Sequence, residues 1–60
     1  MGELFSIRVT VNGRKKVMLM VKYLDAACRA AHRVMEEMPN ATKAEVVRDD
    51  GVVMYEEVRR

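Results

Sequence analysis

Hydrophobic and polar residues alternate strictly near the start of the chain. The apolar positions are Phe5, Ile7, Val9 and Val11, and a polar residue follows each of them. This two-residue period is typical of a strand with one buried face. Asn12-Gly13 comes next, and both residues tolerate the positive φ of a tight hairpin turn. The pattern therefore predicts a strand at residues 5–11 that pairs with a second strand at residues 16–23.

The second predicted strand does not alternate, because residues 17–21 are all apolar. A two-residue turn predicts that Ile7 pairs with Met18, whereas a three-residue turn predicts that Ile7 pairs with Leu19 or Val17. A shift of one residue exchanges the two faces of a strand. In either register, an apolar set of this strand lies away from the apolar row of the first strand. That set is either Met18 and Met20, or Val17, Leu19 and Val21.

A helix is predicted for residues 26–38, because apolar residues recur there at spacings of three and four. This stripe consists of Leu24, Ala27, Cys28, Ala31, Val34, Met35 and Met38. Asp25 precedes it and is predicted to be the N-cap, because its carboxylate can accept hydrogen bonds from free backbone N–H groups. Pro39 disfavours helical backbone at Met38 and therefore ends the helix.

A second hairpin is predicted after the helix, with strands at residues 42–48 and 52–58 joined by Asp49-Asp50-Gly51. We expect Arg59 and Arg60 to fray. The element order β-β-α-β-β predicts an α+β fold with a four-stranded, mostly antiparallel sheet and one helix packed on one face. Either of the first two strands can be central in such a sheet.

The length of the chain limits how much it can bury. Residues 1–60 form a single small domain, and a domain of this size buries only about 60% of its unfolded surface. Its stability is therefore marginal unless a disulfide, a metal or a partner chain adds to it. A single cysteine cannot form an internal disulfide, which favours a reduced, cytoplasmic setting. No apolar run reaches the roughly 18 residues that cross a bilayer, so we expect no membrane contact.

The doubly apolar second strand predicts an interface. One helix covers one face of a sheet, and a strand that is apolar on both sides normally has both sides covered. A second copy of the chain is the economical cover, which makes a homodimer the expected assembly. The candidate protein interface consists of Met18, Leu19, Met20 and Val21.

Residues capable of catalysis or metal binding are sparse. Cys28 and His32 are four residues apart, which suits half a zinc site, but the chain has no other cysteine or histidine. We interpret them as a core thiol and a boundary imidazole, and we predict no catalytic residue, no metal and no cofactor. The sequence thus predicts a small non-enzymatic protein-interaction module. Its size and topology resemble those of small accessory or inhibitor proteins of phages and mobile elements, which act on a larger intracellular protein.

Charge supports an alternative function. The first hairpin is basic, and its candidate nucleic-acid contacts are Arg8, Arg14, Lys15, Lys16 and Lys22. The net charge of +2 is small for a nucleic-acid-binding protein, so this function is the alternative. The second hairpin is acidic, with Glu45, Asp49, Asp50, Glu56 and Glu57. Opposite charges of this kind can align two hairpins or two subunits, although solubility alone also explains them.

Overall fold

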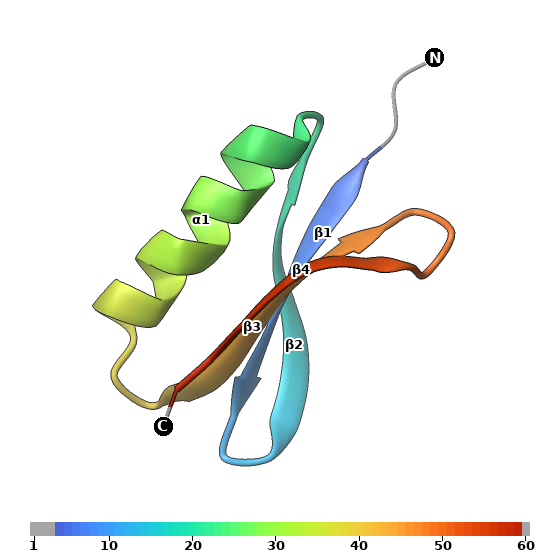
Figure 1. Ribbon diagram of the computed structural model, residues 1–60. Helices are drawn as coiled ribbons and strands as arrows, with labels where there is room; N and C mark the ends of the chain where they lie inside the picture. The colour runs from blue at the N-terminus through green and yellow to red at the C-terminus, as the bar shows by residue number, and fades with distance from the viewer. Residues whose placement is uncertain (1–3, 60) are drawn as a thin grey trace.

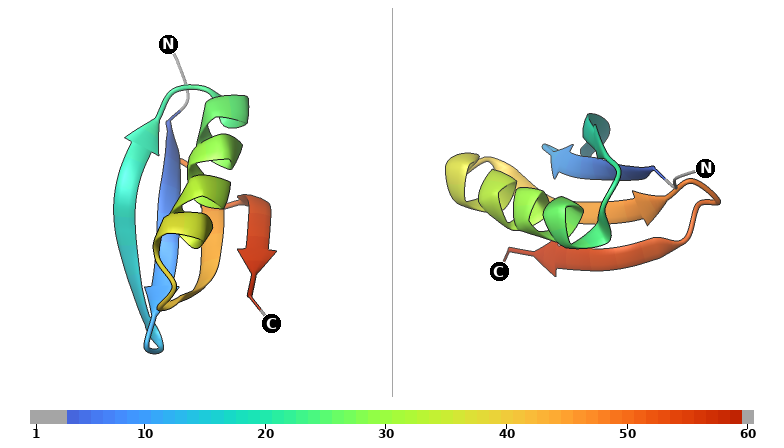
Figure 2. Two further views of the ribbon diagram at one scale, coloured as in Figure 1. Left: turned by 90° about the vertical axis from the view of Figure 1, so that its left-hand side faces the viewer. Right: turned by 90° about the horizontal axis from the view of Figure 1, so that it is seen from above.

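A computed structural model describes residues 4–59, which form one four-stranded antiparallel sheet with a helix on one face (Figure 1). The elements are β1 (Phe5–Val11), β2 (Arg14–Val21), α1 (Leu24–Glu37), β3 (Ala41–Arg48) and β4 (Val53–Val58). Their order across the sheet is β2-β1-β3-β4, so β1 and β3 are central and β2 and β4 are the edges. Figure 2 shows the twisted sheet with α1 on one side only. This architecture confirms the predicted α+β fold.

Both predicted hairpin turns are present. Asn12 and Gly13 have φ values of 54° and 77°, and the flanking residues Val11 and Arg14 face each other across the strands. Gly51 has a φ of 92° in the second turn. Because L-residues other than asparagine rarely adopt positive φ, these residues account for the position of each turn.

A β-bulge at Met18 resolves the lack of alternation in β2. Val9 pairs with Lys16, as expected for the two-residue turn, but the register then shifts and Ile7 pairs with Leu19. The pairing of Ile7 with Met18 is therefore wrong and the alternative pairing with Leu19 is present, although a bulge within β2, and not a three-residue turn, produces it. The bulge also reverses the parity of the strand. Val17, before it, and Met20, after it, both lie on the face away from the helix.

The helix begins two residues earlier than the sequence pattern predicts. Its N-cap is Tyr23, which has extended backbone and no side-chain capping bond, so the prediction of Asp25 as the N-cap is wrong. The backbone N–H of Ala27 donates to the Tyr23 carbonyl over 2.9 Å, which closes the first turn before Asp25 can cap it. Asp25 lies inside that turn, where its carboxylate interacts favourably with the positive end of the helix.

Arg59 does not fray as predicted. Its backbone N–H donates to the Thr42 carbonyl over 2.9 Å, and its guanidinium donates to the carbonyls of Ala41, Met38 and Met35. The Met35 carbonyl would normally accept from the residue four positions later, but that residue is Pro39, which has no N–H. Arg59 therefore supplies hydrogen-bond donors to backbone carbonyls at the C-terminal end of α1. Arg60 lies outside the described residues.

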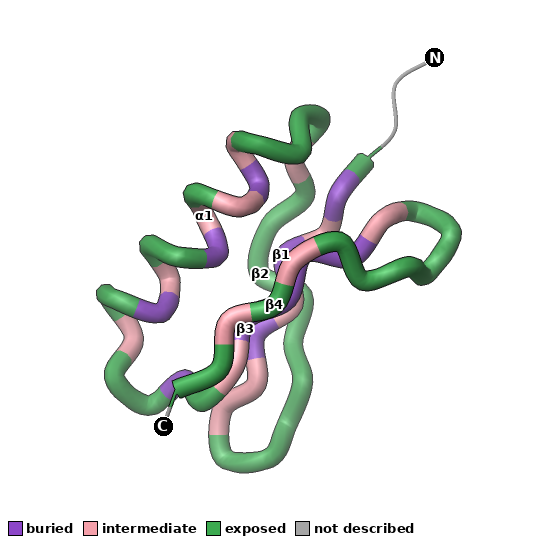
Figure 3. Tube along the Cα trace, in the orientation of Figure 1, coloured by how far each residue is buried: buried purple, intermediate pink, exposed green. Residues whose placement is uncertain are grey.

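The core lies between α1 and the two central strands. Its buried residues are Phe5, Ile7, Val9, Ala27, Ala31, Met35, Ala41, Ala44 and Val46. Several are alanines, which allow the helix to approach the sheet closely. Figure 3 shows that burial is concentrated in β1, β3 and the inner side of α1, while β2 is exposed along nearly its whole length.

Candidate protein-interaction surface

The side of the sheet opposite α1, called here the open face, carries three rows of side chains that run across all four strands. The strand pairing puts Met20, Ser6, Val47 and Val53 in one row. The next row contains Val17, Arg8, Glu45 and Glu56. The third row contains Lys15, Thr10, Lys43 and Val58. The open face therefore has a row that is apolar except for Ser6, a row that is charged except for Val17, and a mixed row.

Apolar side chains on the open face are exposed at both edges of the sheet. Met20 is 57% exposed and Val17 is 52% exposed on β2, while Val53 is 46% exposed and Val58 is 56% exposed on β4. Only Val47, on the central strand β3, is buried. Because α1 lies on the other face, no element among residues 4–59 covers these side chains.

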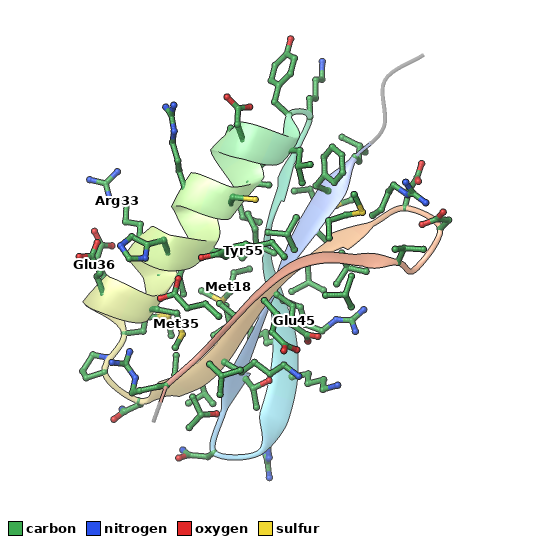
Figure 4. All side chains as sticks on the ribbon, in the orientation of Figure 1. Met18, Arg33, Met35, Glu36, Glu45 and Tyr55 are labelled. Atoms are coloured by element: carbon green, nitrogen blue, oxygen red, sulfur yellow. The ribbon has the colours of Figure 1, made fainter. Side chains whose placement is uncertain are left out.

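The four residues of the predicted interface divide between two surfaces. Met20 lies on the open face, whereas Leu19 and Val21 share the helix side with their partners on β1. Met18, the bulge residue, points toward the helix side of the sheet (Figure 4). Leu19 borders a shallow groove of about 380 Å³ between β2 and α1. The groove is lined by Leu19, Ala26, Arg29, Ala30, Arg33, Val34 and Glu37.

Glu45 is an unusual residue of the open face, because it is only 5% exposed although no helix covers it. Its Oε2 atom lies 3.6 Å from Lys43 Nζ, but its buried Oε1 atom has no hydrogen-bond partner. Arg8 is its neighbour across the β1–β3 pair, yet Arg8 forms no ion pair with any residue of the described chain. The sequence places Glu45 in an acidic hairpin and gives no signal that this carboxylate is buried.

Most acids of the second hairpin are paired within the chain. Lys43 Nζ lies 2.9 Å from Glu56 Oε2, and this hydrogen bond is the main reason that the pKa of Lys43 is raised. Arg48 donates to both carboxylate oxygens of Asp50, over 3.0 and 2.6 Å, and thereby lowers the pKa of Asp50. The acidic hairpin is therefore largely neutralised and offers little free negative charge to a partner.

His32 connects α1 to β4 through Glu57. Its Nδ1 lies 3.1 Å from Glu57 Oε1, which also accepts a 2.8 Å hydrogen bond from the Tyr55 hydroxyl. The bond to Glu57 is the main cause of the raised pKa of His32, and the bonds from Tyr55 and His32 lower the pKa of Glu57. Within residues 4–59, no group of three or more histidine, cysteine, aspartate or glutamate side chains could hold a metal ion. The contact between His32 and Glu57 joins α1 to β4. The sequence did not predict it, because it depends on β4 lying beside the helix.

The structure separates the candidate nucleic-acid contacts. Arg14, Lys15 and Lys16 are exposed together beside the first turn. Lys22 lies beyond the opposite end of β2, and Arg8 lies in the middle of β1 on the open face. Three of the five cations thus form a cluster at the hairpin tip, and the alternative function stays a prediction.

Comparison with known proteins gives no relative from which a function could be inferred, so the surface described above is the basis for a proposal. No protein-family model, curated protein or solved structure matches the chain. No helix in residues 4–59 has the length and apolar character that a bilayer crossing requires. What the fold and its surface define is a small α+β domain with one covered and one open sheet face.

Proposed function

We propose that the protein is a small non-enzymatic interaction module that works as a homodimer through the open face of its sheet. The observation that carries this proposal is the exposure of Met20, Val17 and Val53 on the face that α1 does not cover. Several exposed apolar side chains on one face of a sheet are typical of a protein contact. Burying it against an identical face would add hydrophobic stabilisation to a chain whose own core is small.

The edges of the sheet support docking through the face. β2 has a bulge at Met18, and the β3–β4 register shifts between Val46 and Val47 in the same way. Bulges and edge lysines such as Lys15 and Lys16 disfavour the addition of a strand from another chain. A sheet-on-sheet contact avoids both obstacles. A typical interface of about 800 Å² per partner would use roughly a fifth of the 4442 Å² surface of the protomer.

The proposal extends to a role as an accessory or inhibitor of a larger intracellular protein. A dimer that uses the open face leaves the groove between β2 and α1 free, because the two surfaces lie on opposite sides of the sheet. The half-buried thiol of Cys28, without a partner cysteine, supports a reducing, cytoplasmic setting.

Substitutions at two adjacent residues test the homodimer. We expect the wild-type protein to have the mass of a dimer by sedimentation or light scattering, with dissociation on dilution. Met20→Lys places a charge in the proposed interface and should give a monomer. Leu19→Lys is the matched control, because Leu19 is 49% exposed but lies on the helix side, and this variant should remain a dimer. A wild-type protein that stays monomeric at high concentration would refute the proposal.

Binding of nucleic acid is the second candidate function. Arg14, Lys15 and Lys16 form no ion pair with other residues of the described chain, which leaves their charge available at the hairpin tip. Affinity for DNA or RNA that falls steeply between two salt concentrations would support this function, because phosphate contacts release counterions.

A further inference from the structure

The buried carboxylate of Glu45 on the open face lacks a hydrogen-bond partner for its Oε1 atom. A buried oxygen without a hydrogen-bond partner is costly, and the cost is greater for an ionised group. Lys43 lies near the other oxygen of Glu45 but makes its shorter contact with Glu56. Oε1 itself is closed to solvent, so a cation from a second chain would reach this carboxylate through the 6% of the side chain that remains exposed.

Two kinds of two-fold dimer can bring the open faces of two sheets together. With the axis across the strands, the order of the rows is reversed, so Arg8 would face Arg8 of the second copy and Glu45 would face Glu45. With the axis parallel to the strands, each row faces itself and the strand order is reversed instead. β1 then lies over β3 of the second copy, because these strands are the central pair of β2-β1-β3-β4. With both axes centred on the charged row, only this second arrangement places opposite charges against each other.

We infer that two copies dock with the two-fold axis parallel to the strands, so that Arg8 of each copy pairs with Glu45 of the other. This inference rests on the proposed homodimer and specifies its geometry. The register also sets Met20 over Val53 of the second copy, and Ser6 over Val47. Met20 and Val53 of the two sheet edges therefore cover each other, Val17 lies over Glu56, Val58 lies over Lys15, and the two charge pairs lie near the axis.

The dimensions of packed sheets suit this contact. Facing sheets lie about 10 Å apart, a gap that an arginine and a glutamate can bridge from opposite sides. Pairing buried charges usually carries a large desolvation cost for both groups. Here Glu45 is already 95% removed from water in the protomer, given its exposure of 5%, so that part of the cost is incurred on folding. Docking then adds the attraction between Arg8 and Glu45, and the carboxylate does not have to be desolvated a second time.

Two complementary charge reversals test the pairing. Arg8→Glu alone brings two acids together at each contact, and Glu45→Arg alone brings two arginines together. We expect each variant by itself to lose at least about tenfold in dimer affinity. An equimolar mixture should form a heterodimer, because both of its contacts then join an acid to an arginine. Sedimentation of the mixture gives the mass, and circular dichroism checks that each variant is folded.

Crosslinking provides a second measurement that holds even if Glu45→Arg fails to fold. In a Cys28→Ala background, the Met20→Cys variant is mixed with the Val53→Cys variant and treated with a short bis-maleimide. Residues 20 and 53 lie on opposite edges of one sheet, so crosslinks between them join two chains. The inferred geometry predicts crosslinking in the mixture, and a mixture of Met20→Cys with Lys15→Cys is the control that should stay uncrosslinked.

The outcomes separate this inference from the proposed function. A monomeric wild-type protein removes both. A wild-type dimer whose charge-reversal mixture does not recover, or that crosslinks residue 20 to residue 15 and not to residue 53, overturns the geometry and leaves the homodimer standing. Single variants that dimerise like the wild type also overturn the pairing of Arg8 with Glu45.

Discussion

Val46 and Val47 are neighbours in β3, and both are buried, but they belong to opposite faces of the sheet. Val46 lies under α1, level with Ile7 and Tyr55. Val47 lies on the open face, with Ser6 and Val53 beside it and no helix above it. The comparison shows that, in so small a domain, position across the sheet matters as much for burial as the choice of face. Central strands are sheltered by their neighbours, and edge strands remain exposed on both sides.

The two valines provide the largest expected difference between the faces. Val46→Ala should cost about 2 kcal/mol of unfolding free energy, because it removes two buried methyl groups and leaves a cavity beneath the helix. Val47→Ala removes the same atoms where nothing packs from above, so it should cost about 1 kcal/mol. Urea denaturation at a concentration that keeps the protein monomeric gives both values. Equal losses would mean that the open face is packed as tightly as the core.

Arg59 tests the end of the helical layer on the covered face. Arg59→Ala should lower the unfolding free energy by about 1 kcal/mol, because the Met35 carbonyl loses its donor and the Met38 carbonyl keeps only the bond from the Ala41 N–H. Thermal unfolding followed by circular dichroism should then shift downward by about 4–8 °C. Arg59→Lys keeps the charge near the helix end but not the planar set of donors, and should lose part of this stability. An unchanged melting temperature in Arg59→Ala would contradict the capping role.

His32 provides the smallest effect, and it also concerns the covered face. Its pKa is raised above 6.5 in the folded protein, mainly by the hydrogen bond to Glu57, so its stabilising contribution is complete below pH 6.5 and is lost as the pH rises through the raised pKa. The pKa of Glu57 is lowered, so its contribution is complete above pH 4.5 and is lost on further acidification. The pair therefore stabilises the fold most between pH 4.5 and 6.5.

In His32→Gln, unfolding free energy should vary less with pH on the alkaline side of this window than it does in the wild type. Urea midpoints measured from pH 5 to pH 9 in both proteins give the difference. The effect is small, because the side chain of His32 is 59% exposed. Parallel pH profiles for the two proteins would show that the contact between α1 and β4 adds nothing.

The elements of the fold were predictable because their signals are local. The alternation of residues 5–11, the positive φ that Asn12 and Gly13 tolerate and the proline after the helix each act within a few residues. For the strand order, the sequence left either β1 or β2 as the central strand. The order depends on which of these two strands pairs with β3, and β3 follows the helix in the chain. Sequence alone therefore predicted the elements well and their neighbours less well.

The candidate surface was only partly predictable. The apolar run in β2 correctly indicated exposed apolar side chains, but a bulge within such a run leaves no mark in the hydrophobic pattern. The register therefore stayed open, and the candidate interface included both Met20 and Leu19, which lie on opposite sides of the sheet. The burial of Glu45 and the contact of His32 with Glu57 depend on pairings between distant segments, which no local pattern encodes.

The pairing of β1 with β3 also determines when the chain can complete its fold during synthesis. Residues 5–11 can form a hairpin with β2 as soon as both have left the ribosome, but their other neighbour, residues 41–48, is made much later. Until then Ile7 and Val9 have no core to enter, and such nascent chains are prone to aggregate. Half of the open face comes from β3 and β4, so two unfinished chains cannot form the proposed dimer. In the proposed dimer, completed protomers would therefore fold first and associate afterwards.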